Sequence, residues 1–167
     1  MANDHILVAT DGSDQARDAV AMGARLAKAI GADLTVLHVV PPALSGVQHG
    51  FFGPRRVFAI GTMVPRMPRT TEILQRPGDG IDESTLALGE EIVAEAANEA
   101  CRLGVENVDA RVEIGDCAET ILDTAREIGA SMIVVGSGGL GGLQGMILGS
   151  VSKTVTKHAH CSVLIIR

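Results

Sequence analysis

Aromatic residues are almost absent from this chain of 167 residues, which has no tryptophan, no tyrosine and three phenylalanines. Proteins that hold single-stranded nucleic acid stack its bases on such side chains. The charge balance points the same way, because 14 basic against 20 acidic residues give a net charge of −6. Nucleic-acid binders usually carry a basic surface instead. We therefore expect no nucleic-acid partner.

Long apolar runs are also missing. No stretch approaches the roughly 18 apolar residues of a membrane-spanning helix, and the first 17 residues lack the apolar centre of a signal peptide. The three cysteines, Cys101, Cys117 and Cys161, are odd in number and form no disulfide motif. The spacing of His158, His160 and Cys161 matches no tetrahedral zinc site. We expect a cytoplasmic protein with reduced thiols, no membrane span and no metal site. Cys117 opens a helix, where a thiol pKa is often lowered, but we expect an inert cysteine there.

What the chain does contain is an alternation of apolar runs and amphipathic stretches, which predicts a parallel sheet with helices on both faces. The class is α/β, in one domain over residues 1–167. An irregular insertion at about residues 41–80 interrupts it. In the second helix, Glu90, Glu91, Glu95 and Glu99 are expected to face outward. The predicted strands are 5–10, 34–40, 108–114, 132–135 and 162–167, and the predicted helices are 14–30, 82–103, one from 116 and one from 150.

Seven glycines lie between Gly136 and Gly149, directly after an apolar strand and before a helix that opens near Ser150. Backbone N–H groups at such a helix start attract anions, so the stretch predicts a phosphate cradle, with Ser150 as a candidate N-cap. A P-loop is excluded because no lysine precedes Ser150. Gly136, Gly138 and Gly141 spell a dinucleotide motif, but no acidic residue follows about 20 positions later to hold a ribose.

The spacing Gly136-x2-Gly139-x9-Gly149-Ser150 resembles the nucleotide-binding motif of the universal stress protein family. The resemblance covers nearly the whole chain. It implies a doubly wound, five-stranded parallel sheet of order 3-2-1-4-5, the adenine nucleotide alpha hydrolase-like fold. That order reverses between strands 1 and 4, where a ligand crevice is expected.

In ATP-binding members of the family, the acid after strand 1 contacts the nucleoside and the backbone after strand 2 contacts adenine. The glycines and the following serine hold the phosphates. The resemblance therefore implies ATP, with or without Mg, as the ligand. AMP or cyclic AMP is the alternative, because no basic residue lies between Gly136 and Ser150. Asp11 and Ser13 are also alternative caps of the first helix. The implied nucleotide-binding residues, with their flanking neighbours, are Thr10, Asp11, Val39, Gly136, Gly139, Gly149, Ser150 and Val151.

The function expected from this resemblance is that of a regulatory protein of the stress response with an unidentified protein partner. A nucleotide-independent interaction protein is the alternative. We assign no catalytic residues, although slow ATP hydrolysis stays open. The apolar strand Val163 to Ile166 falls at the predicted sheet edge, which predicts a homodimer through that strand.

Residues 47–80 carry five arginines against Glu72 and Asp79, a charge of +3 that leaves −9 elsewhere. Long loops in compact domains are usually functional or disordered. One hypothesis is that residues 47–76 form a mobile lid, with Arg55 or Arg56 over the nucleotide and Phe51 and Phe52 packing beneath. The alternative is a solvated insertion or a partner-docking segment.

Overall fold

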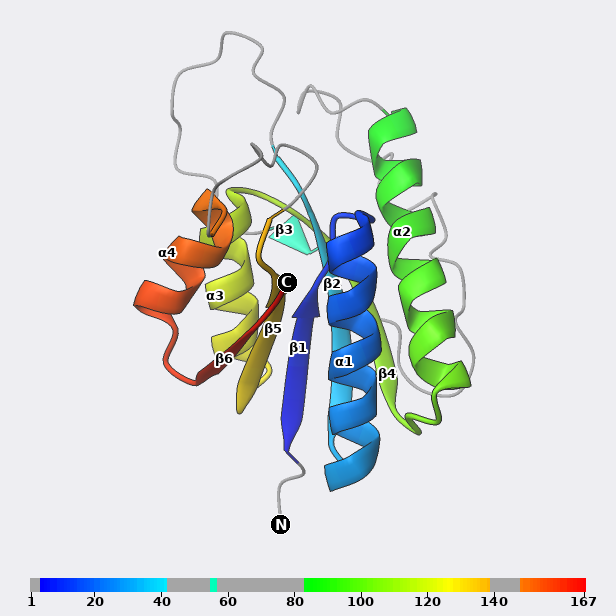
Figure 1. Cartoon of the computed structure of the whole chain (residues 1–167). Helices are drawn as coiled ribbons and strands as arrows, with labels where there is room; N and C mark the ends of the chain where they lie inside the picture. The colour runs from blue at the N-terminus through cyan, green and yellow to red at the C-terminus, as the bar shows by residue number, and fades with distance from the viewer. Residues whose placement is uncertain (1–3, 42–54, 57–82, 139–147) are drawn as a thin grey trace, which may run out of the picture.

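The structure is a computed structural model, which describes residues 4–41, 55–56, 83–138 and 148–167. Five parallel strands form the sheet in the order β4-β2-β1-β5-β6, which is the predicted order 3-2-1-4-5 (Figure 1). The strands are β1 (His5–Ala9), β2 (Asp33–Val40), β3 (Arg55–Arg56), β4 (Val108–Ile114), β5 (Met132–Gly136) and β6 (Ser162–Ile166). The helices are α1 (Asp14–Ile30), α2 (Glu83–Arg102), α3 (Cys117–Glu127) and α4 (Ser150–His158).

A sixth strand, β3, was not predicted. Its residues Arg55 and Arg56 pair antiparallel with Ile114 and Glu113 at the outer edge of β4. Two charged residues carry no alternating apolar pattern, so the sequence gives no signal for this strand. The rest of the predicted insertion, from residue 42 to 54 and from 57 to 80, lies outside the described residues.

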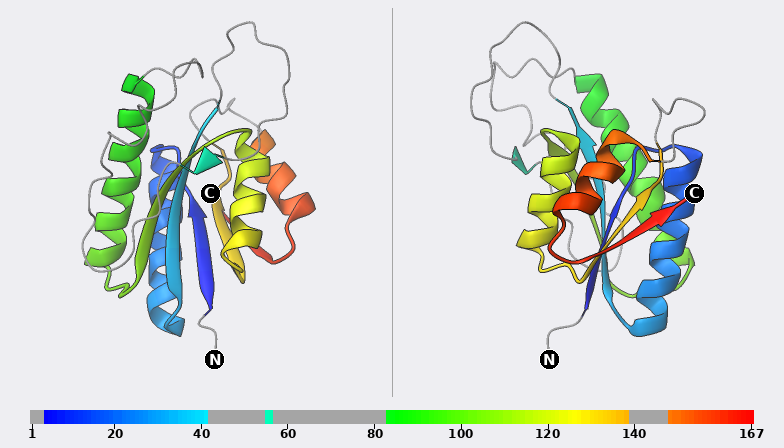
Figure 2. Two further views of the ribbon diagram at one scale, coloured as in Figure 1. Left: turned by 180° about the vertical axis from the view of Figure 1, so that it is seen from behind. Right: turned by 60° about the vertical axis from the view of Figure 1, so that its left-hand side comes forward.

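The sheet separates two apolar layers because alternate residues of each strand face opposite sides. Ile6 and Val8 of β1 pack toward α1 and α2, whereas Leu7 packs toward α3 and α4. Both views in Figure 2 show these helix pairs on opposite faces of the sheet. Within the described part of the chain, no helix is long and apolar enough to cross a bilayer.

Helix α1 begins and ends as the sequence predicts. The Ser13 hydroxyl accepts a hydrogen bond from the Ala16 N–H at 3.3 Å, and Gly31 closes the helix at φ 68°. Along its buried face the helix lies very near β1, since a Cβ on Gly23 would fall 2.4 Å from a methyl of Val8. Only glycine permits that approach. This close approach packs the middle of α1 directly against β1.

Glu90 corrects the predicted orientation of α2. Its side chain is buried, with 7% of the residue exposed, whereas Glu91 and Glu95 are exposed as expected. The position follows from helical spacing, because residue 90 lies four after the buried Leu86 and three before the buried Val93. The prediction treated all four glutamates as outward-facing, although Glu90 shares the buried face of Leu86 and Val93.

Candidate functional site

The strand order reverses between β1 and β5, so the chain leaves these neighbours toward opposite faces of the sheet. From β1 it enters α1, and from β5 it passes through the glycine stretch into α4 on the other face (Figure 1). Ligands of doubly wound folds bind in the crevice at such a point. Thr10 and Asp11 stand at the end of β1, and Gly136 ends β5. The two predicted motifs thus meet at one edge of the sheet.

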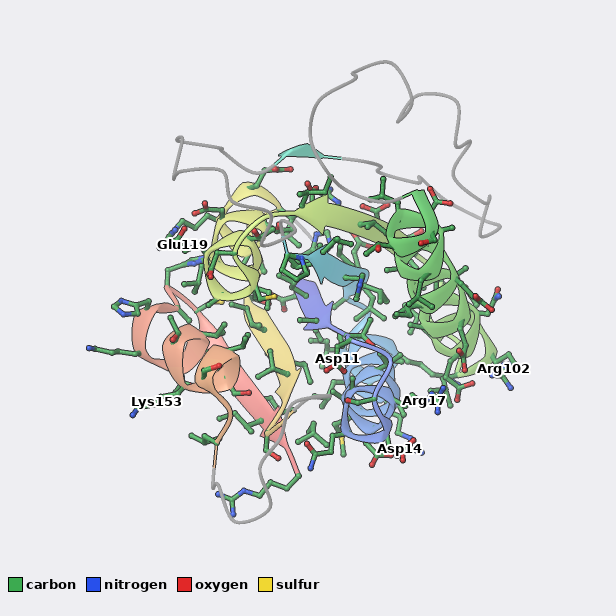
Figure 3. The ribbon with its side chains drawn as sticks, turned by 90° about the horizontal axis from the view of Figure 1, so that it is seen from above. Asp11, Asp14, Arg17, Arg102, Glu119 and Lys153 are labelled. Atoms are coloured by element: carbon green, nitrogen blue, oxygen red, sulfur yellow. The ribbon has the colours of Figure 1, made fainter. Side chains whose placement is uncertain are left out.

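A tight hydrogen-bonded turn shapes the exit of β1. The buried Thr10 donates its N–H to the Leu37 carbonyl at 2.9 Å, and its hydroxyl accepts from the Gly12 N–H at 3.2 Å. Gly12 has φ 79°, a conformation that favours glycine. The Asp11 carboxylate accepts from the Ser13 N–H at 3.0 Å, while Ser13 itself caps α1. Of the two predicted caps, Ser13 is therefore the one used, and the turn presents Asp11 near the centre of this end of the molecule (Figure 3).

Three hydrogen bonds close the base of the glycine stretch. The Ser137 N–H donates to the Ile166 carbonyl, and the Gly149 N–H donates to the Ser137 carbonyl, each at 2.6 Å. The buried Ser152 hydroxyl donates to the Gly136 carbonyl, also at 2.6 Å. These bonds bring the exit of β5 and the start of α4 together. Gly139, the remaining predicted glycine, lies outside the described residues.

Among the described residues, no side chain caps the N-terminus of α4. Its N-cap is Gly149, at φ −68° and ψ 163°, which corrects the prediction of Ser150 as the cap. Ser150 is instead the first helical residue, and the first backbone bond of the helix runs from the Lys153 N–H to the Gly149 carbonyl at 3.0 Å. The first turn, which includes Val151, contains no acidic residue. Its early N–H groups form a partial positive charge suited to an anion.

The exit of β2 contributes backbone at Val39 and a residue that sequence reasoning missed. The side chain of Val39 is buried in the core toward α3 and α4, so only its backbone can meet a ligand. His38 donates its Nδ1 hydrogen to the Thr10 carbonyl at 2.8 Å, because a carbonyl can only accept. His38 thus joins the ends of β1 and β2. No short spacing signals a bond between positions so far apart in the chain.

Acidic groups gather on the α3 side of the crevice. Burial, and then the charges of Asp116 and Asp11, raise the pKa of the Cys117 thiol. These effects outweigh the lowering expected at a helix start and support the prediction of an inert cysteine. Asp116 caps α3 by accepting from the N–H groups of Ala118 and Glu119, each at 3.0 Å. Carboxylates here suit the hydroxyl groups of a sugar, whereas the α4 end suits an anion.

Basic side chains of the neighbouring helices point elsewhere. Figure 3 shows Lys153 extending outward from α4, away from Asp11. Arg17 forms ion pairs with Asp14 at 3.3 Å and Glu95 at 3.7 Å. No group of three or more histidine, cysteine, aspartate or glutamate residues that could hold a metal ion occurs among the described residues. The donors that the described site offers to a phosphate are therefore mainly neutral backbone groups.

The two arginines of the lid hypothesis lie on β3, with β4 and β2 between β3 and β1. Because β3 pairs with the last residues of β4, it lies at the carboxyl end of the parallel strands, as the site does. The closing of a lid over the nucleotide stays a prediction.

Known proteins resemble this chain in both sequence and fold. The sequence model of the universal stress protein family matches residues 2–58 and 63–167. Universal stress protein YxiE of Bacillus subtilis is 35% identical over 165 residues, which cover 97% of each chain. A universal stress protein solved in complex with cAMP matches with a TM-score of 0.68 and 23% identity, over 100% of this chain and 99% of that one. The Archaeoglobus fulgidus protein in complex with dAMP matches with a TM-score of 0.68 and 20% identity, over 100% of both chains. The chain belongs to the universal stress protein family.

Proposed function

We propose that this protein binds an adenine nucleotide in the crevice between the ends of β1 and β5. The observation that carries the proposal is the uncapped N-terminus of α4, held beside the exit of β5 by the bond between Gly149 and Ser137. An anion placed there would receive backbone N–H groups and the favourable end of the helix dipole. Two proteins with this fold were solved in complex with cAMP and dAMP, which supports an adenine nucleotide as the ligand.

In the proposed arrangement the phosphate lies at Ser150 and Val151, the sugar hydroxyls lie near Asp11, and adenine lies against the backbone at Val39. A hydrogen bond to a charged group contributes about 1.5–3 kcal/mol, so a few backbone donors could hold one phosphate without a basic side chain. ATP, with or without Mg, is the ligand that the family motif implies. AMP or cyclic AMP is the alternative ligand, and the neutral donors of the described site favour it because it carries less charge than ATP.

The role that we propose is regulatory binding in a cytoplasmic stress response, rather than efficient catalysis. A homodimer through β6 and a separate protein partner belong to the same proposal. A nucleotide-independent interaction protein is the competing function. Mass spectrometry of small molecules released from protein purified without added nucleotide separates the two, because a bound adenine nucleotide is expected only under the first.

The decisive variant is Gly149→Asp. The backbone of Gly149 already has the extended conformation of an N-cap, and an added Cβ would meet its nearest neighbour, the Ser137 carbonyl oxygen, at an ordinary 3.4 Å. Aspartate should therefore cap α4 and stabilise the fold by about a few tenths of a kcal/mol relative to glycine. Its carboxylate would also occupy the place of the phosphate and repel it. We expect calorimetry to show nucleotide binding lost in a protein that melts no earlier than wild type.

Gly149→Asn is the matched control, because asparagine caps a helix equally well but carries no charge. We expect this variant to keep more nucleotide affinity than Gly149→Asp. Equal affinity in wild type and Gly149→Asp would show that the phosphate does not lie at α4, and the proposal would then be wrong.

A further inference from the structure

Gln15 joins the start of α1 to the first part of the glycine stretch. Its Oε1 accepts a hydrogen bond from the Gly138 N–H at 2.9 Å. Its backbone also lies against β5, because a Cβ on Gly136 would fall 3.3 Å from the Gln15 carbonyl carbon. Gln15 therefore contacts both described glycines at the exit of β5. No motif in the sequence marks this residue as part of the site.

Gly138 is in turn adjacent to the start of α4. A Cβ on Gly149 would lie 3.6 Å from the Gly138 Cα and 3.4 Å from the Ser137 carbonyl oxygen. Two helix starts thus approach Gly138 from opposite sides, α1 through the Gln15 side chain and α4 through Gly149. Their N-cap residues differ: the Ser13 hydroxyl caps α1, whereas Gly149 has no side chain to cap α4. A charge at position 15 would therefore stand close to the N-terminus of α4, whose N-cap residue Gly149 has no side chain.

The chemical character of Gln15 matters for this position. An amide oxygen can hold the Gly138 N–H without bringing a formal charge. A glutamate would accept the same hydrogen bond, more strongly because it is ionised. It would also place a negative charge at Gly138, which lies next to the N-cap of α4. The neutral amide of Gln15 can therefore hold the Gly138 backbone without repelling an anion at α4.

We propose that Gln15 is a positioning residue of the phosphate site, which holds Gly138 in place and keeps this side of the site neutral, so that it sets how much ligand charge the site accepts. The inference rests on the nucleotide-binding function proposed above. Its role differs from that of the family motif, because Gln15 acts through the glycine backbone and through its lack of charge.

Three ligands that differ in charge test the proposal: adenosine, AMP and ATP. They are titrated by calorimetry into wild type, Gln15→Glu and Gln15→Ala. We expect Gln15→Glu to weaken AMP by about tenfold, which corresponds to about 1.4 kcal/mol, and ATP by more, since the repulsion grows with ligand charge. Adenosine should bind as it does to wild type. Gln15→Ala should weaken both phosphate ligands by a smaller and nearly equal factor, because it releases Gly138 without adding charge.

The matched control is Asn98→Asp, the same amide-to-acid change on the exposed face of α2. It should leave all three affinities unchanged. A second readout is the hydrogen exchange of the Gly138 amide, which should be faster in Gln15→Ala than in wild type and stay slow in Gln15→Glu.

The outcomes separate this inference from the function on which it rests. If wild type binds none of the three ligands, the proposed function is wrong and the inference fails with it. If wild type binds AMP and Gln15→Glu binds AMP and ATP equally well, only the role of Gln15 is refuted. If Gln15→Glu weakens adenosine as much as AMP, the residue has a purely structural role and the charge argument is wrong.

Discussion

The carboxyl group of Glu90 is buried, and within the described part of the chain its Oε1 has no hydrogen-bond partner. Burial raises the pKa of this group. An unsatisfied buried polar group typically costs about 1–3 kcal/mol, so an apolar side chain of similar size should be more stable at this position. We expect Glu90→Met to raise the free energy of unfolding by an amount in that range at neutral pH, measured by urea denaturation.

The effect should depend on pH in a defined direction. A raised pKa means that the folded state favours the protonated carboxyl, so stability from this group is present at low pH and lost as pH rises through the folded pKa. The gain from Glu90→Met should therefore be larger at about pH 8 than at about pH 5. Glu91→Met, on the exposed neighbour, should change stability little at either pH. A gain that is the same at both pH values would contradict the burial of an ionisable group.

Other residues of the site were beyond sequence reasoning for a common physical reason. Gln15 bonds to Gly138, and His38 bonds to Thr10, across long separations in the chain. Spacing rules describe neighbours within a helix turn or along a strand, and these pairs are set by the folded backbone instead. Asp11, by contrast, follows directly on a strand end and could be placed because parallel strands end at one edge.

At the scale of elements, prediction succeeded wherever one local signal decided the outcome. Strand patterns predicted the five parallel strands, and α1 covers Asp14–Ile30 as predicted. It failed where a tertiary contact decided. The strand β3 is defined by its pairing with β4. The N-cap of α4 is Gly149 rather than Ser150, since its extended backbone accepts the first helical bond while its own N–H donates to Ser137. The positions of β5, α1 and α4 relative to one another therefore form the part of the site that required the structure.

The junction of β5 and α1 has little spare room. A Cβ on Gly136 would lie 3.3 Å from two backbone atoms, the Gln15 carbonyl carbon and the Gly138 oxygen. Since backbone yields poorly, Gly136→Ala should move α1 away from β5 and destabilise the fold by about 1–3 kcal/mol, the usual range for overpacking. It should also weaken nucleotide binding. Thermal unfolding and calorimetry measure the two effects.

Gly149→Ala provides the comparison for this prediction. Its Cβ would make only ordinary contacts, from 3.4 Å outward, and its φ of −68° suits any residue. The stability of this variant should fall by only about 0.5 kcal/mol, because alanine is a poorer N-cap than glycine. If Gly136→Ala proved as stable as Gly149→Ala, the close approach of α1 and β5 would be refuted.

On the scale of the whole molecule, β6 is the last strand of the described sheet on its side and pairs only with β5 there. The Ser162 N–H donates to Ser131, and the Ile166 carbonyl accepts from Ser137, so even-numbered residues bond inward. In a strand the next residues point the opposite way. Val163 and Ile165 thus direct their backbone groups to the open edge. A second copy of the chain could pair there, as proposed for the homodimer.

Two proline variants distinguish the dimer edge from the fold. Ile165→Pro removes an N–H that faces the open edge, so it should abolish dimerisation in sedimentation experiments while the thermal unfolding temperature changes modestly. Leu164→Pro removes an N–H that bonds to β5 and should destabilise the monomer as well. A wild-type chain that sediments as a monomer at micromolar concentration would refute the proposed dimer.

The hydrogen bond between Ser137 and Ile166 has one more consequence. It fastens the final residue of the edge strand to the backbone that begins the glycine stretch. If the chain self-associates at β6 and binds a nucleotide beside the glycine stretch, as proposed, this bond links the two events, and thermodynamic reciprocity governs the pair. If AMP lowers the dimer dissociation constant by some factor, dimerisation must lower the AMP dissociation constant by the same factor. Sedimentation measures the dimer dissociation constant with and without saturating AMP. Calorimetry measures AMP affinity at protein concentrations above and below that dissociation constant. The two ratios should give one common coupling constant that differs from unity.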